Sequence, residues 1–385
     1  MATERIGKLQ KALFYLALTI ELVLMIVEKS EISFGYESYV FRATFILTLI
    51  SMVLLKRDKK EWVVLAALVA FTFLCYEISG KNDLLRVVVF MAAARDIDLK
   101  KAIKYSFWVS FVGFTVVSLL ALAGVLGDIY LVTDYGRGIA NESRMVLGFG
   151  HPNTLFGCVY VLVLMWLWLY GEGASILAHI VVIMISFTFA ALTRSRTGIA
   201  VLAMTLVLAV ILRLVPKLKE VKLLYFLEAL VTPIMCIVFA VIAAGFAEYA
   251  YTGHGIQTPS NFWQFDEKMN GRISNLYYGV PNHGGILCNI RLIAGRGTDG
   301  FFDLGWNRLL YWYGYLPTLL IAVAILCLIY LCYKKRDMWT LLIILSVSVY
   351  TIIEATFVTR YIGRCFYFLI AGVYFGYLFK RKTDD

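Results

Sequence analysis

Apolar runs of roughly 20 residues recur along the whole of this 385-residue chain. They constrain its fold more than any other feature, because a run of that length spans the hydrocarbon core of a bilayer as one α-helix. Only 16% of the residues are charged, whereas a soluble domain averages about 25%. We therefore predict an all-α, polytopic integral membrane protein in which residues 1–385 form a single membrane domain.

Hydropathy predicts twelve membrane-spanning helices, which would leave both termini on the same side. The spans are expected near residues 10–27, 38–55, 62–79, 84–94, 104–126, 153–170, 175–193, 198–215, 223–245, 307–333, 338–353 and 363–379. The fourth is short and carries Arg86, so we expect it to be tilted, broken or partly re-entrant.

The loops on the two sides differ in the kind of basic residue they carry. One side, with both termini, holds 15 Lys and 6 Arg, and the rest of the chain holds 3 Lys and 12 Arg. By the positive-inside rule the lysine-rich side is cytoplasmic. Arginine binds phosphate or carboxylate through a planar fork of donors, so the outer face is expected to bind an anion. Ordinary loop charge with snorkelling side chains is the alternative.

The stretch "GFGHPNTLFG" (148–157) ends a predicted outer loop, residues 127–152, that also carries Arg137 and Arg144. Pro152 suits the first turn of a helix, and His151 and Asn153 stand beside it. A helix amino end offers free N–H donors and a positive dipole end. The stretch therefore predicts an anion site, with a simple helix cap as the alternative.

The stretch "TRSRTG" (193–198) predicts a short outer turn between two spans. Arg194 and Arg196 lie there against hydrocarbon, with hydroxyl side chains next to them. Two guanidinium groups at one tight turn are typical of a diphosphate clamp, and snorkelling to lipid headgroups is the alternative.

A large outer loop is expected at residues 246–306, with short helices of its own. Loops of this length are usually functional, and its aromatic residues suit sugar rings. Its polar candidates, with Glu354 from the last outer turn, are His254, Arg272, His283, Arg291, Arg296, Asp299 and Asp303.

Together these stretches resemble the Wzy-type polymerases of O-antigen and capsular polysaccharide repeat units, in the O-antigen ligase-like superfamily. The resemblance rests on "GFGHPNTLFG", on "TRSRTG" one helical hairpin later, and on "NGRISNLYYG" and "IAGRGTDGFFDLGWNRLLYWYG" in the large loop. It covers roughly residues 130–320 and includes an Arg-x10-Gly spacing formed by Arg137 and Gly148. It implies a GT-C-like membrane fold.

The resemblance also implies a glycosyltransferase of the bacterial cytoplasmic membrane, working at its outer face with both termini in the cytoplasm. Such an enzyme transfers glycan from undecaprenyl diphosphate onto another lipid-linked repeat unit. It needs no metal, nucleotide or other cofactor, because the lipid diphosphate is already the leaving group. The partners implied are membrane lipid, a flippase and a chain-length regulator, and no nucleic acid.

This chemistry needs fixed positive donors for the diphosphate and a base for the acceptor hydroxyl. The base is left open among Asp303, His151, His283 and Glu354. The substrate-binding candidates are Arg194, Arg196, Arg272, Arg291, Arg296, Arg137 and Asn153.

Two other functions remain open on the sequence. One is an O-antigen ligase, although ligases place a histidine before the late span and "FFDLGWNRLL" has none. The other is a flippase or transporter of lipid-linked oligosaccharide, which we expect to carry polar residues through the bundle. Glu21, Glu77 and Glu228 are the mid-span charges that stand out. A dolichol-type transferase is disfavoured, because the first predicted outer loop has no aspartate.

The predicted orientation is testable by labelling in intact cells. On a cysteine-free background, Gln257→Cys should react with a membrane-impermeant thiol reagent because residues 250–300 are expected outside. Lys219→Cys should react only after the membrane is opened. Protection of position 257 together with labelling of position 219 would reverse the orientation.

Overall fold

The computed structural model describes residues 2–133, 141–298, 300–355, 358 and 366–379. Within them the elements are α1 (Ala2–Glu28), α2 (Glu37–Val53), α3 (Lys59–Ser79), α4 (Asp83–Ala93), α5 (Leu99–Leu122), β1 (Tyr130–Thr133), β2 (Glu142–Met145), α6 (Pro152–Tyr170), α7 (Ile176–Thr193), α8 (Arg196–Leu214), η1 (Pro216–Glu220), α9 (Lys222–Ala229), η2 (Leu230–Met235), α10 (Cys236–Thr252), α11 (Phe262–Lys268), α12 (Asn275–Tyr278), η3 (Pro281–His283), η4 (Leu287–Asn289), α13 (Gly305–Tyr313), α14 (Tyr315–Lys335), α15 (Met338–Ile353) and α16 (Tyr367–Gly376).

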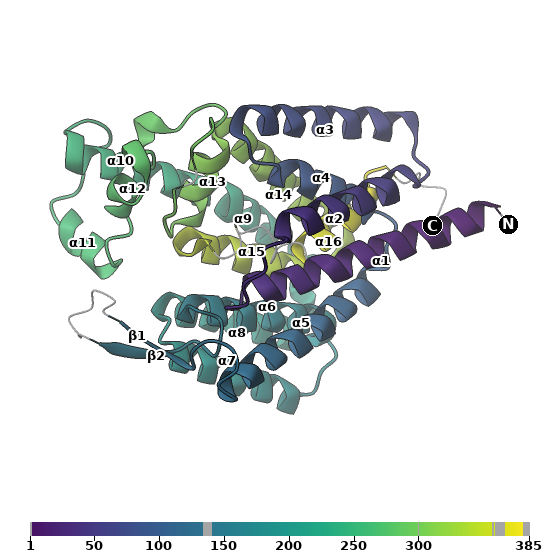
Figure 1. Ribbon diagram of the computed structural model, residues 1–385, viewed down its shortest axis with the longest axis horizontal. Coiled ribbons are helices and arrows are strands. Elements are labelled where there is room, and N and C mark those ends of the chain that lie inside the picture. The colour runs from purple at the N-terminus through teal and green to yellow at the C-terminus, as the bar shows by residue number, and fades with distance from the viewer. Residues whose placement is uncertain (1, 134–140, 299, 356–357, 359–365, 380–385) are drawn as a thin grey trace.

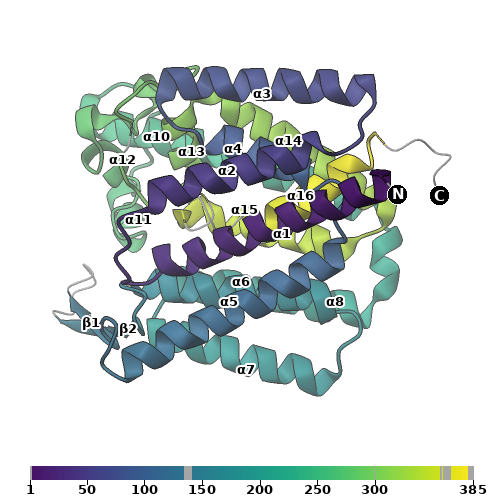
Figure 2. The same cartoon turned by 45° about the vertical axis from the view of Figure 1, so that its right-hand side comes forward.

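The long helices run roughly alongside one another and give the molecule two distinct ends (Figure 1). The antiparallel β1–β2 hairpin, α11 and α12 lie together at one end, which we call the hairpin end. The other end holds the start of α1 and the turn between α2 and α3, which contains Lys56 and Arg57 (Figure 2). We call it the basic end.

Eight helices among the described residues are long and apolar enough to cross a bilayer, and two shorter apolar helices, α15 and α16, accompany them. Many of their large side chains face outward, as the exposed Leu177, Met184 and Phe226 illustrate. Outward-facing apolar side chains are costly in water and favourable in lipid. The polytopic membrane architecture is therefore confirmed, while the count of twelve spans stays a prediction.

Two spans and the all-α fold class differ from the expectation. The span expected at 223–245 extends through α9, η2 and α10 to Thr252, so the large loop begins later than residue 246. The span expected at 307–333 is two helices, because Gly314 has φ +97° and lies against the carbonyl oxygens of Arg291 and Leu292. A Cβ there would lie 2.8 and 2.7 Å from those atoms. The fold is also not purely helical, since the 127–152 loop contains the β1–β2 hairpin.

A buried ion pair joins α1, α2 and α4 inside the bundle. Arg86 Nη2 lies 2.8 Å from Glu21 Oε1, and the Thr44 hydroxyl donates to the same oxygen at 2.7 Å. The Arg86 guanidinium also lies 4.4 Å from the centre of the Phe41 ring. Charge buried in this way is tolerated because the pair is hydrogen-bonded on several sides.

Removing one partner should therefore destabilise the bundle strongly. We expect Glu21→Leu to cost about 3–5 kcal/mol, because it leaves a buried guanidinium without its carboxylate. The double variant Glu21→Leu/Arg86→Met should recover most of that loss. Thermal unfolding of the purified protein in detergent measures both.

Glu4→Gln is the matched control, because the Glu4–Lys8 pair is exposed (side chains 69% and 77%) and exposed pairs contribute little. If Glu21→Leu and Glu4→Gln lowered the melting temperature equally, the buried pair would not stabilise the bundle.

Candidate functional site

The hairpin end brings together five of the residues predicted from the sequence. Arg272 Nη2 lies 2.5 Å from Glu354 Oε1, and Arg272 Nε lies 3.3 Å from Asp303 Oδ2. The Asn153 amide donates to the same Glu354 oxygen at 3.0 Å. His151 borders this group, since its Nδ1 accepts from the backbone N–H of Asn153. We call these five residues the Arg272 cluster.

The Arg272 side chain is held by a tight turn in the large loop. Asn270 and Gly271 both have positive φ, at 59° and 66°, a conformation that suits these two residue types. The buried Asp266 carboxylate accepts from Ile273 N at 2.8 Å and from the backbone and side chain of Ser274. These bonds fix the backbone on the far side of Arg272.

The two carboxylates of the cluster come from different elements and differ in exposure. Glu354 caps the carboxyl end of α15, and its side chain is 6% exposed, whereas the side chain of Asp303 is 40% exposed. Gly305 lets the start of α13 approach the end of α15, because a Cβ there would lie 2.6 Å from Thr351 O. Burial raises the pKa of Glu354, while Arg272 lowers it and Asp303 raises it.

His151 and Asn153 begin α6, so the "GFGHPNTLFG" stretch is a helix amino end in the structure. His151 is the N-cap with extended backbone, and its Nδ1 accepts from Asn153 N at 3.2 Å. Pro152 occupies the first turn. Burial lowers the pKa of His151, with Asp303 raising it and Arg144 lowering it. A neutral His151 that accepts at Nδ1 carries its proton on Nε2.

Arg308 on α13 is a buried residue that sequence reasoning missed. Its side chain is fully enclosed, donates through Nε to Phe302 O at 2.9 Å, and lies 3.5 Å from the centre of the Phe301 ring. Burial lowers the pKa of Arg308 to about 10, and the charges of Asp303 and Glu354 raise it. Among the described residues, its Nη1 has no hydrogen-bond partner. The sequence signal for its burial is that Arg308 stands among apolar residues in "GWNRLL".

The "TRSRTG" stretch forms the tight turn expected between α7 and α8. Arg194 has φ +50°, and the Ser195 hydroxyl caps α8 by accepting from Gly198 N at 3.3 Å. The buried Glu142 of β2, which the sequence did not single out, lies 3.5 Å from Arg194 Nη1 and 2.8 Å from Arg144 Nη2. Arg194 and Arg196 are exposed. The turn therefore presents guanidinium groups beside the hairpin.

The contacts of three other candidates lie elsewhere. His283 stacks on Tyr277 with ring centres 3.7 Å apart. Arg296 donates to Glu77 O at the end of α3, at 3.4 Å, and Arg291 is exposed on the loop. No contact with the Arg272 cluster is found for these three among the described residues. Arg137 and Asp299 lie outside the described residues.

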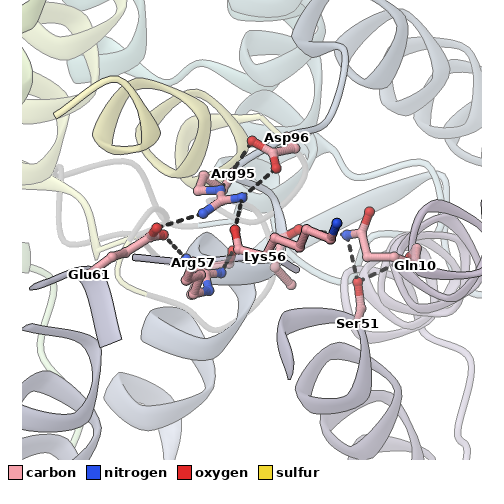
Figure 3. Close-up of polar contacts among 9 residues, drawn as sticks. Gln10, Ser51, Lys56, Arg57, Glu61, Arg95 and Asp96 are labelled. Atoms are coloured by element: carbon pink, nitrogen blue, oxygen red, sulfur yellow. Dashed lines mark hydrogen bonds and ion pairs between the residues drawn. The ribbon is translucent and has the colours of Figure 1, made fainter. Parts of the chain in front are cut away.

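A second cluster of charges lies at the basic end (Figure 3). Arg95 Nη1 lies 2.6 Å from Glu61, which also pairs with Arg57, and Arg95 Nη2 lies 2.6 Å from Asp96. Arg95 Nη2 donates to Lys56 O, and Arg57 Nη2 donates to Ala92 O. These bonds tie the α2–α3 turn to the end of α4, so the cluster serves packing at that end.

The chain matches no family model, no curated protein and no solved structure.

The lowered pKa of His151 predicts how the stability of the protein depends on pH. Its pKa is lowered in the folded state, so the unfolded chain binds more protons as the pH falls through about 6.5. The stabilisation from neutral His151 is thus present above that pH and is lost below it. His151→Asn keeps a capping side chain without titrating.

We expect the wild-type melting temperature to fall more than that of His151→Asn between pH 7.5 and pH 5.5. Thermal unfolding in detergent at both pH values gives the comparison, and the other histidines are common to both proteins. Parallel pH profiles would show that His151 is not held neutral by the fold.

Proposed function

We propose that this protein is a polysaccharide polymerase that transfers lipid-diphosphate-linked glycan onto another lipid-linked repeat unit. The observation that carries the proposal is the Arg272 cluster, a group of charges and donors at the hairpin end of a membrane bundle. Perturbed, buried titratable groups that converge on one place are typical of functional sites. The resemblance of the same stretches to Wzy-type polymerases supports this chemistry.

The orientation is part of the proposal. Lysine-rich loops lie at the basic end, and the positive-inside rule favours the cytoplasm there. The hairpin end then faces outward, where no nucleotide sugar is available. A glycan already linked to a lipid diphosphate carries its own leaving group, so the reaction needs neither nucleotide nor metal activation.

The leaving diphosphate is expected to bind to the arginines of the hairpin end. Arg272 is fixed by the Asp266-held turn, and Arg194 and Arg196 project from the α7–α8 turn. The His151 Nε2–H and the amino end of α6 add donors that suit phosphate oxygens. Donors held in place before the reaction stabilise developing negative charge without reorganising.

Asp303 is the better base of the two cluster carboxylates. It is partly open to solvent, whereas Glu354 is enclosed and already accepts from Arg272 and Asn153. In the proposed step the acceptor hydroxyl attacks the anomeric carbon, its proton passes to Asp303, and the bond from that carbon to the diphosphate oxygen breaks. Glu354 then acts as a positioning residue that holds Arg272.

An aromatic surface near the cluster suits the sugar rings. Tyr251 stacks on Tyr277 at 4.6 Å, and Trp263 and Tyr278 each lie edge-on to Tyr251. Trp263 and Tyr278 are exposed. Exposed rings held by one another offer flat apolar faces at little cost in side-chain entropy.

The arginine roles predict a specific set of losses. Arg194→Ala and Arg196→Ala should each abolish long-chain product, because they remove fixed donors for the leaving diphosphate. Asp303→Asn should do the same, because a general base contributes roughly 10²–10⁴-fold. Lysine at 194 or 196 should restore little, since a point charge does not replace a guanidinium fork. Chain-length distribution per amount of membrane-inserted protein, in cells lacking the native copy, is the measurement.

Arg291→Ala is the matched control, because it removes an exposed guanidinium from the large loop, outside both the Arg272 cluster and the α7–α8 turn. Wild-type chains from the Arg194→Ala/Arg196→Ala double variant, or equal losses from Arg291→Ala, would count against the clamp.

Two substitutions of His151 distinguish a role as hydrogen-bond donor from a role as general base. If it donates to the diphosphate, His151→Gln should retain part of the activity that His151→Ala loses, because an amide still donates a hydrogen bond. Equal and complete loss in both variants, at normal protein levels, would assign the base to His151 in place of Asp303.

A further inference from the structure

An apolar groove runs along α6 and is lined by residues of α5, α6 and α7. Its volume is about 390 Å³, and its lining residues are almost entirely apolar, including Phe111, Phe114 and Phe189. On α6 it extends from Leu155 to Trp166. At 1.5 Å per residue that is about 16 Å, or about half of a 30 Å hydrocarbon core. The groove thus has the depth of one membrane leaflet.

One end of this groove is continuous with the hairpin end of the molecule. Leu147 and Phe149 line it, and they connect β2 to His151. On the opposite wall, Phe189 lies one helical turn before the α7–α8 turn that carries Arg194 and Arg196. The ion pair between Arg194 and Glu142 brings the two sides together. The apolar groove therefore ends next to the basic side chains of the α7–α8 turn.

A second apolar groove, between α3, α4, α14 and α16, provides a contrast. Its volume is about 190 Å³, and its charged end is formed by Arg57, Glu61 and Arg95. Those charges pair with one another at the basic end (Figure 3). The charged end of this groove therefore lies at the basic end, opposite the Arg272 cluster.

The geometry points to the α5–α6–α7 groove as the site that holds the polyprenyl chain of the lipid-diphosphate substrate. This inference rests on the proposed function. A chain lying in the groove places its diphosphate between His151 and the Arg194–Arg196 turn, at the height where the membrane interface meets the bundle. Apolar lining below and guanidinium groups above match the two parts of such a lipid.

The test uses the full-length protein in nanodiscs and a diazirine-bearing polyprenyl diphosphate without sugar. We expect the cross-links to map to groove residues of α5 and α7. Unlabelled polyprenyl diphosphate should compete, and phosphatidylglycerol should not. Ser118→Trp and Ile185→Trp fill the groove from opposite walls, and each should reduce labelling roughly tenfold.

Ala324→Trp, in the second groove, is the matched control and should label as the wild type does. Ile185 is 52% exposed, so its replacement is expected to leave folding intact, and size-exclusion profiles check this. Cross-links in the second groove, equal competition by phosphatidylglycerol, or undiminished labelling of Ile185→Trp would overturn the assignment.

The same proteins separate this inference from the function on which it rests. Groove labelling that Ile185→Trp removes, in a protein that never extends glycan chains, would keep the lipid site and reject the polymerase. Chain extension that survives Ile185→Trp would keep the polymerase and reject the groove.

Discussion

The enclosure of the Glu354 carboxylate is the constraint on which the arrangement of the hairpin end depends. A carboxylate with a side chain only 6% exposed loses most of its hydration, so it must be paired and hydrogen-bonded to persist. Arg272 from the large loop and Asn153 from α6 meet that need. One buried acid at the end of α15 therefore binds the loop to the bundle and sets the position of Arg272.

The pairing of charged side chains also differs between the two ends of the molecule. At the basic end, Glu61 and Asp96 pair with Arg57 and Arg95, and the bonds close the α2–α3 turn against α4. At the hairpin end, Asp303 stays partly exposed and Arg308 keeps a buried donor without a partner among the described residues. The basic-end charges are engaged in contacts between elements, whereas a partly exposed carboxylate such as Asp303, held beside the Arg272 guanidinium, is available to a ligand.

Much of the fold follows from sequence alone, because spans of apolar residues have few alternatives in a bilayer. The sequence also predicts the start of α6 at Pro152 and the α7–α8 turn at Arg194, because polar residues interrupt apolar runs at both places. The break at Gly314 was not, because the α13–α14 run is apolar on both sides and only the approach of the Arg291 and Leu292 carbonyls requires it.

The sequence predicts the types of residue in the candidate site, but it does not predict which of them come together. Residue type and loop position selected Arg272, Asp303 and Glu354, yet they also selected His283 and Arg296, whose contacts lie elsewhere. Which side chains converge depends on packing between distant segments, such as the 201 residues that separate Asn153 from Glu354. Arg308, Asp266 and Glu142 were missed because burial, not sequence spacing, gives them their roles.

A reaction with purified components tests directly whether this protein polymerises lipid-linked repeat units. The protein in nanodiscs is incubated with the lipid-linked repeat unit from the same cells, in the presence of a metal chelator and without nucleotide, and the products are identified by mass spectrometry. We expect a dimeric repeat unit on one lipid and one polyprenyl diphosphate released per linkage formed. Recovery of only unlinked repeat units, from protein that binds the substrate, would contradict it.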